Sequence, residues 1–239
     1  MYRNIVSIHQ PNLFPRIKVL QKIFHSDTYI CYDDVQFVRN DWQNRVFIRN
    51  IKDLRLFWLS IPVVKPNGQK SKINEVNIHE QKKIIAELRC KIEKAYASSK
   101  HWSEIQAYVE PAINVIYEKT SISEFLYLSL KSLINLLCPQ TKIIRSSEIS
   151  DALSIEKNMR LIELCNLANA TGYICGSGGL KYIDESMFEL HGINLLIQDW
   201  NEDNIKLKYD NLHWRNVSFI DFWARYGLEE LKNILGGSL

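Results

Sequence analysis

The chain lacks the signatures of an extracellular, metal-binding or membrane-spanning protein. It has no CxxC pair, and its cysteines are odd in number and dispersed: Cys31, Cys90, Cys138, Cys165 and Cys175. This pattern argues against a disulfide framework or a zinc knuckle and is typical of reduced thiols. No apolar run approaches roughly 20 residues, and the start lacks the basic flank and apolar core of a signal peptide. We expect a cytoplasmic protein without stable membrane insertion.

The sequence also lacks a dominant charge, internal repeats and low-complexity linkers. The formal net charge of +3 is spread over 239 residues, with no basic run of the kind that binds nucleic acid. The hydrophobic fraction of 46% is enough for a full core. We therefore expect one α/β domain over residues 1–239 and a neutral or small anionic ligand, and no binding of nucleic acid.

Hydrophobic periodicity predicts an α/β fold with a largely parallel sheet and flanking helices. The predicted sheet strands are residues 5–8, 29–32, 142–145, 172–175 and 193–198. The predicted helices are residues 17–24, 80–98, 102–117, 121–137, 155–169 and 180–191, with two short ones within 217–235. The three helices near 80–138 form a helical insert. Short β-rich runs at 46–48, 56–63 and 73–78 indicate a small antiparallel segment.

Polar side chains follow the first two predicted strands. His9, Gln10 and Asn12 come after residues 5–8, and Asp33 and Asp34 come after residues 29–32. Ligands of open α/β sheets bind at the carboxyl ends of strands. A carboxylate bonded to one imidazole nitrogen would make His9 a general base, and strand alternation allows only one of the two aspartates to meet it. The alternative is a buried histidine that ties down its own loop.

Two further segments have the residue types of a ligand site. Trp42, Gln43, Asn44 and Arg45 place an aromatic platform, two amides and a guanidinium in consecutive positions, which is common in sites for sugars, nucleotides and phosphates. The alternative is an exposed loop anchored by Trp42.

The second segment is a glycine-rich loop at residues 176–179. Ser177, Gly178 and Gly179 lie between a predicted strand and a predicted helix, so their amides are expected to cradle a phosphate or carboxylate, with Tyr182 nearby. Three glycines can also serve close packing alone. Cys175 is interpreted as a packing cysteine.

In combination, these motifs resemble the WbqC-like family. The resemblance rests on residues 7–12 with Phe14-Pro15, residues 33–37 (which include Gln36), residues 42–45, 61–63 and 73–76, and residues 176–179 with Tyr182 and Asp184. It runs in order along most of the chain. There are two departures: Arg16-Ile17-Lys18-Val19-Leu20 stands where relatives have aromatic residues, and residues 208–211 differ from a late family motif.

The resemblance implies a role in the biosynthesis of bacterial O-antigen or a related polysaccharide. Such pathways modify nucleotide-linked amino sugars, so we expect an N-acyl or aminoacyl transferase with His9 as general base and amide groups that steady an oxyanion. No permanently bound cofactor is expected; CoA or an acyl carrier protein would supply the thioester. Nucleotidyl transfer to a sugar phosphate and non-catalytic binding of a sugar nucleotide are the alternatives. The sequence leaves a need for Mg²⁺ open.

Overall fold

The centre of the protein is a five-stranded parallel sheet. The computed structural model describes residues 4–149, 153–154 and 156–237. The strands lie in the order β7 (Lys142–Arg145), β2 (Thr28–Cys31), β1 (Ile5–His9), β8 (Gly172–Gly176) and β9 (Asn194–Gln198), and every neighbouring pair is parallel. The predicted α/β class and the predicted parallel sheet are therefore confirmed.

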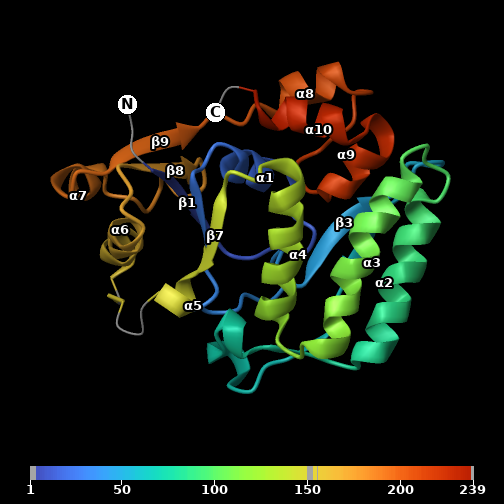
Figure 1. The fold of residues 1–239 in the computed structure, drawn as a ribbon, viewed down its shortest axis with the longest axis horizontal. Coiled ribbons are helices and arrows are strands. Elements are labelled where there is room, and N and C mark those ends of the chain that lie inside the picture. Colours follow the sequence, from blue (N-terminus) through green and yellow to red (C-terminus); the bar gives the residue numbers. More distant parts are fainter. Residues whose placement is uncertain (1–3, 150–152, 155, 238–239) are drawn as a thin grey trace.

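Helices cover both faces of this sheet (Figure 1). On one face lie α1 (Ile17–Phe24) and α4 (Ile122–Leu137), and the other face packs against α6 (Lys157–Leu167) and α7 (Glu185–Leu190). Because side chains alternate along a strand, β1 sends Val6 and Ile8 into the core beside α6. His9 points to the opposite face, toward α1.

The order of the strands creates a switch point at the middle of the sheet. After β1 the chain builds outward through β2 and β7, then crosses back to place β8 on the opposite side of β1. The two loops that leave the carboxyl ends of β1 and β8 therefore diverge. Open α/β sheets bind their ligands in the crevice formed at such a point.

Two antiparallel pairs complete the β structure: β3 (Arg45–Arg49) with β4 (Leu56–Ser60), and β5 (Val63–Val64) with β6 (Asn77–Ile78). Residues 73–78 were predicted as one β run, but 3-10 helix η2 (Ile73–Glu75) precedes β6. The Glu75 carboxylate accepts a hydrogen bond from the Lys72 backbone N–H at 2.9 Å, which closes this turn. A second 3-10 helix, η1 (Gly68–Lys70), lies in the connection.

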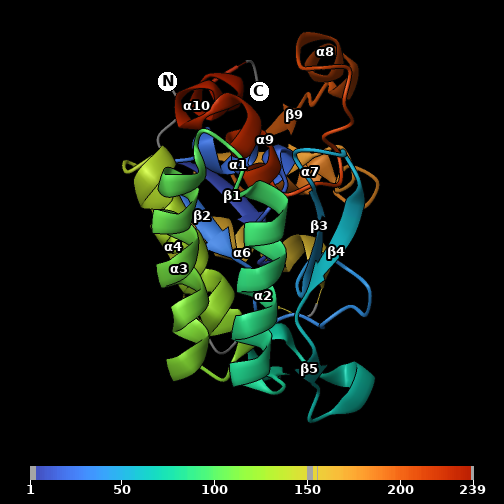
Figure 2. The same cartoon turned by 90° about the vertical axis from the view of Figure 1, so that its right-hand side faces the viewer.

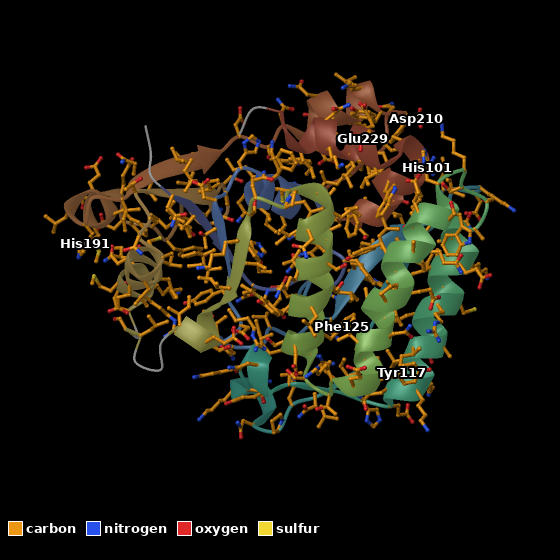
Figure 3. All side chains as sticks on the ribbon, viewed as in Figure 1. His101, Tyr117, Phe125, His191, Asp210 and Glu229 are labelled. Atoms are coloured by element: carbon orange, nitrogen blue, oxygen red, sulfur yellow. The ribbon has the colours of Figure 1, made fainter. Side chains whose placement is uncertain are left out.

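The segment predicted as a helical insert forms α2 (Gln81–Tyr96), α3 (Trp102–Glu118) and α4 (Figure 2). In Figure 3, Phe125 of α4 lies in the middle of the molecule, whereas Tyr117 lies near the end of α3; they are 0% and 54% exposed. The carboxyl-terminal helices α9 (Phe219–Tyr226) and α10 (Leu228–Leu235) pack beside α3 and α1.

Two short helices, α5 (Ser146–Ile149) and α8 (Glu202–Lys208), were not predicted. The helix predicted at 180–191 begins only at Glu185, because Asp184 caps it through the Ser186 N–H at 3.1 Å. The first residue of the helix predicted at 155–169 lies outside the described residues. No helix in the part of the chain that the structure describes has both the length and the hydropathy needed to span a membrane.

Candidate functional site

A cavity of about 360 Å³ lies at the switch point, and its charged lining groups are basic. We call it the cationic cavity. It lies between α1 and the loop after β8, and Arg16, Lys18, Lys22 and Arg215 supply four side-chain cations. None of its described lining residues is acidic; they also include His9, Tyr173, Cys175, Gly176, Gly178, Gly179 and Gln198. An anion with more than one charge would complement this lining.

Lys22 is the most buried of the four cations. It is 7% exposed, and its ammonium lies 3.8 Å from the position that a Cβ on Gly176 would occupy. Among the described residues, Lys22 has no ion pair to a carboxylate. The neighbouring Gln198 is 2% exposed, and its Oε1 likewise has no hydrogen-bond partner in the described chain. Lys22 and Gln198 thus place a cation and an amide oxygen without described partners side by side at this cavity.

The pKa values of the cations that line the cavity are lowered by burial and by one another. Burial, followed by the influence of Lys18 and Arg16, lowers the pKa of Lys22 to about 8, with Cys175 acting in the opposite direction. Burial is also the largest cause that lowers the pKa of Arg16 to about 10. Burial and the neighbouring arginines lower the pKa of Lys18, which Glu202 partly offsets. A bound anion would oppose each of these shifts, because it favours the charged form of the neighbouring cation.

His9 lies at the end of β1 and lines the same cavity. Its Nδ1 is 2.7 Å from the backbone oxygen of Gln10, and because a carbonyl only accepts, Nδ1 carries the proton. Nε2 is therefore left with a lone pair. Burial and then Lys22 lower the pKa of His9 to about 3, so the ring is neutral at pH 7. This tautomer, with an unprotonated Nε2, is the form that accepts a proton.

A second cavity of about 600 Å³, the central cavity, adjoins the first and shares His9, Arg16, Gly178 and Gly179 with it. It adds Asn12, which is 6% exposed and whose Oδ1 has no hydrogen-bond partner among the described residues. The Asn12 amide N–H donates to the Gln10 carbonyl at 3.3 Å, which holds its oxygen in place. The Asn12 oxygen is itself closed off from solvent, so the side-chain acceptor that is available to a ligand here is His9 Nε2.

Gln10 and Trp42 also line the central cavity, as the sequence predicted for a ligand site. Gln43 is fully buried behind them and donates from Nε2 to Gln10 Oε1 at 2.7 Å, which leaves the Gln10 N–H₂ group available as a donor. The Arg16 guanidinium lies over the Trp42 ring, 4.3 Å from its centroid. Trp42 therefore acts as a platform for a cation of the site.

The glycine-rich loop reaches both cavities, but without the helix that was expected to follow it directly. Lys18 Nζ donates to Ser177 Oγ at 2.9 Å, and Tyr182, which is 69% exposed, lines the central cavity. Residues 177–182 form turns, and helix α7 begins only at Glu185. The N-terminus of this helix is thus separated from the loop and does not add to an anion site here.

Close packing explains the last glycine of this loop. At Gly179 a Cβ would come within 2.8 Å of Cys175 Sγ, so a larger residue would need this part of the loop to shift. Cys175 is itself buried, and burial raises the pKa of its thiol, which Lys22 partly offsets. A buried, protonated thiol is unreactive, which agrees with its interpretation as a packing cysteine.

The two aspartates do not bond to His9. Asp33 is fully buried and accepts hydrogen bonds from Ser123 Oγ at 2.5 Å, Ser147 Oγ at 3.0 Å and the Ser147 N–H at 3.2 Å. Asp34 forms an ion pair with Arg160 and accepts from Ser146 Oγ at 2.5 Å. Both carboxylates therefore bind α4, α5 and α6 to the end of β2, and the expected carboxylate and imidazole pair is not formed.

Three other predicted residues lie outside the two cavities. Arg45 lies over the Trp58 ring at 4.2 Å and donates to the Asn40 carbonyl. Asn44 donates to the Ile61 carbonyl at 2.8 Å, and Gln36 donates to the Gln69 carbonyl at 2.8 Å. Their polar groups hold loops around β3 and β5 in place.

The residues that sequence reasoning missed are the cations and Gln198. One signal was available: residues 10–26 contain Arg16, Lys18 and Lys22 but no aspartate or glutamate. Lys18 and Lys22 are four residues apart and so share a face of α1, where no local ion pair is available to either. Arg215 and Gln198 reach the cavity from far along the chain, and no local pattern marks them.

The described residues contain no group of three or more histidine, cysteine, aspartate or glutamate side chains that could hold a metal ion. The polar side chains at the cationic cavity include cations, an amide and an imidazole.

Comparison with known proteins places the chain in a family. No solved structure matches the chain. The chain is 30% identical over 200 residues to the uncharacterized protein Rv1507c of Mycobacterium tuberculosis, which covers 82% of each protein. The model of the WbqC-like protein family matches residues 10–233, which include the loop after β1, α1, the glycine-rich loop and Arg215. From this match over nearly its whole length, the chain belongs to the WbqC-like protein family.

Proposed function

We propose that the protein transfers an acyl or aminoacyl group from a thioester to the amine of a nucleotide-linked sugar. The observation that carries the proposal is the adjacency of two features: the cationic cavity, whose Lys22 lacks a counter-ion among the described residues, and His9 with an unprotonated Nε2. The first suits the diphosphate of a sugar nucleotide. The second suits a base that acts on a nucleophile attached to the same ligand.

The central cavity suits an amine nucleophile. An amine has N–H groups to donate, and His9 Nε2 is an acceptor without a donor among the described residues. The Gln10 N–H₂ group, held by Gln43, is a donor that would stabilise the oxyanion formed on the acyl carbonyl. In this arrangement, the amine and the carbonyl meet above the end of β1.

The proposed step moves the acyl group from sulfur to nitrogen. The amine nitrogen attacks the thioester carbonyl carbon, the C–N bond forms, and the C–S bond breaks as the tetrahedral intermediate collapses. His9 Nε2 accepts the proton that the amine loses and returns it to the departing thiolate of CoA or an acyl carrier protein. The products are an N-acylated sugar nucleotide and a free thiol.

Anion binding would also strengthen the base. Lys22, Arg16 and Lys18 each contribute to the low pKa of His9, after burial. A diphosphate that neutralises these cations would raise the pKa of His9 toward its ordinary value, where general-base catalysis at neutral pH is more effective. The phosphates of the substrate would thereby activate the group that acts on its amine.

The test is a reconstituted assay with nucleotide-linked amino sugars and acyl-CoA thioesters, with N-acylated products detected by mass spectrometry. We expect His9→Gln to lower kcat by about 10²- to 10⁴-fold. The same variant should still bind pyrophosphate, whereas Lys22→Met should mainly raise KM. A His9→Gln variant with wild-type kcat would contradict the assignment of the base.

Two alternatives have distinct outcomes in the same assay. Four cations also suit a nucleoside triphosphate, and release of pyrophosphate from it in the presence of a sugar phosphate would indicate nucleotidyl transfer. Binding of sugar nucleotides without turnover of any thioester or triphosphate would indicate a non-catalytic binding protein. Repeating the assay with and without Mg²⁺ would establish whether the reaction needs that ion.

A further inference from the structure

A third cavity, of about 450 Å³, lies beyond the central one and is mainly apolar. We call it the apolar cavity. Its aliphatic and aromatic walls come from the segment after β2, from α6, from β8 and from the turn before α7: Tyr32, Val35, Leu161, Tyr173, Tyr182 and Ile183. Lys157 is its one charged lining residue among the described ones. Neither the binding of a diphosphate nor the action of His9 makes use of this cavity.

The three cavities adjoin one another at the carboxyl ends of the strands, where Tyr173 and Gly179 line all of them. The central and apolar cavities share Gln10, Tyr32, Leu161 and Tyr182, none of which lines the cationic cavity. His9 lines the cationic and central cavities but not the apolar one. A ligand that passed from the cationic cavity through the central one into the apolar one would have its charge at one end, a polar part beside His9, and an apolar part at the other end.

If the proposed function holds, this order restricts which part of the substrates occupies the apolar cavity. With the diphosphate among the cations and the sugar amine beside His9, the acyl carbonyl joins the amine on the side away from the diphosphate. The chain attached to that carbonyl continues in the same direction. The nucleoside is bonded to the other phosphate, so it leaves the cationic cavity on the opposite side from the sugar.

We infer that the apolar cavity holds the acyl chain of the thioester donor, and that the protein selects donors whose acyl group is apolar and longer than acetyl. The lining offers the chain aliphatic contacts from Leu161, Val35 and Ile183. Each CH₂ group transferred from water into such a cavity contributes about 0.8 kcal/mol, or roughly a fourfold gain in affinity. Selection would therefore be by chain length.

The experiment measures binding of acyl N-acetylcysteamine thioesters with acetyl, butanoyl and hexanoyl groups to the full chain. Calorimetric titrations are made with pyrophosphate present at saturation. For wild type, we expect the dissociation constant to fall by about fourfold for each added CH₂ group. Leu161→Gln should flatten this dependence. Leu167→Gln is the matched control, because Leu167 is also on α6, is 50% exposed and does not line the cavity.

A second variant, Tyr182→Ala, keeps the test decisive if Leu161→Gln does not fold. Tyr182 is 69% exposed, so its removal leaves the core intact, and it lines both the central and apolar cavities. We expect it also to reduce the gain in affinity per CH₂ group. Dissociation constants that are independent of chain length in wild type would overturn the inference, as would an unchanged dependence in a folded Leu161→Gln variant.

The same variants separate this inference from the proposed function. If Leu161→Gln weakens the binding of uridine diphosphate but not of pyrophosphate, a nucleobase occupies the cavity and the inference is wrong. If amino sugars are acylated with no dependence on chain length, the inference fails and the proposed function stands. If chain length governs binding but no amine is acylated, the proposed function fails and the cavity remains an acyl site.

Discussion

Two neighbouring strand ends hold charge in opposite ways. At the end of β2, the carboxylates of Asp33 and Asp34 are saturated by serine hydroxyls, a backbone N–H and Arg160. At the ends of β1 and β8, Lys22 lies in a cavity with three further cations and no acidic lining residue among those described. The saturated group contributes to folding, and the unsaturated one is available to a ligand. Whether a charged group already has hydrogen-bond or ion-pair partners, rather than its charge or position alone, separates a role in folding from a role in ligand binding.

The largest expected effect comes from breaking the saturated end. Asp33→Ala removes the acceptor of four hydrogen bonds, from Ser123, Ser146 and Ser147, in a fully buried position. Buried donors left without an acceptor cost about 1–3 kcal/mol each, so the free energy of unfolding should fall by about 3 kcal/mol or more. Urea unfolding measures this loss.

The control for Asp33→Ala is Asp53→Ala, because Asp53 is exposed and accepts from the Arg55 N–H at 3.0 Å. A change within about 0.5 kcal/mol is expected there. If Asp33→Ala unfolded at the wild-type urea concentration but lost pyrophosphate binding, Asp33 would belong to the ligand site and the comparison would fail.

A second effect is the pH dependence of stability that His9 confers. The pKa of His9 is lowered from 6.5 to about 3 in the folded state. Between these values the unfolded state binds the additional proton, so the free energy of unfolding falls as the pH falls, by up to about 1.4 kcal/mol per pH unit. His9→Gln should lack this contribution. Parallel curves of unfolding free energy against pH for wild type and His9→Gln would show that His9 is not held neutral.

The smallest effect concerns the platform beneath Arg16. Trp42→Leu removes the ring that the guanidinium covers at 4.3 Å, which should weaken pyrophosphate binding by roughly fivefold, or about 1 kcal/mol. Trp58→Leu removes an equivalent contact from Arg45, which lies outside the three cavities. Calorimetry should therefore give the wild-type affinity for Trp58→Leu, and equal losses in both variants would remove the special role of Trp42.

The same contrast explains how far sequence reasoning could go. Strand periodicity placed His9 and the glycine-rich loop at strand ends, and the structure brings them to one cavity. The partners of Asp33 could not be predicted, because Ser123 and Ser147 are 90 and 114 residues away in the chain. Residues 42–45 were predicted as one group, but side chains point in alternate directions along β3 and the residues just before it. Trp42 therefore faces the central cavity, whereas Arg45 lies over Trp58.

The cations show a second limit. Lys22 lies in an amphipathic helix, where a lysine normally occupies the solvated face. Only the packing of α1 against the loop after β8 encloses it, and that loop is about 150 residues further along the chain. Local pattern therefore identified the elements of the site, whereas burial, which decides the chemistry, depended on tertiary contacts.

The measurement that tests the account most directly is a calorimetric titration of pyrophosphate into wild type and Lys22→Met at low ionic strength. Lys83→Met is the control, because the Lys83 side chain is 63% exposed on α2. We predict that wild type and Lys83→Met bind alike, and that Lys22→Met loses about 1.5–3 kcal/mol of affinity, a factor of 10 or more, without loss of folding stability. Equal affinity in Lys22→Met, or no binding by wild type, would contradict the claim that the cationic cavity is an anion site.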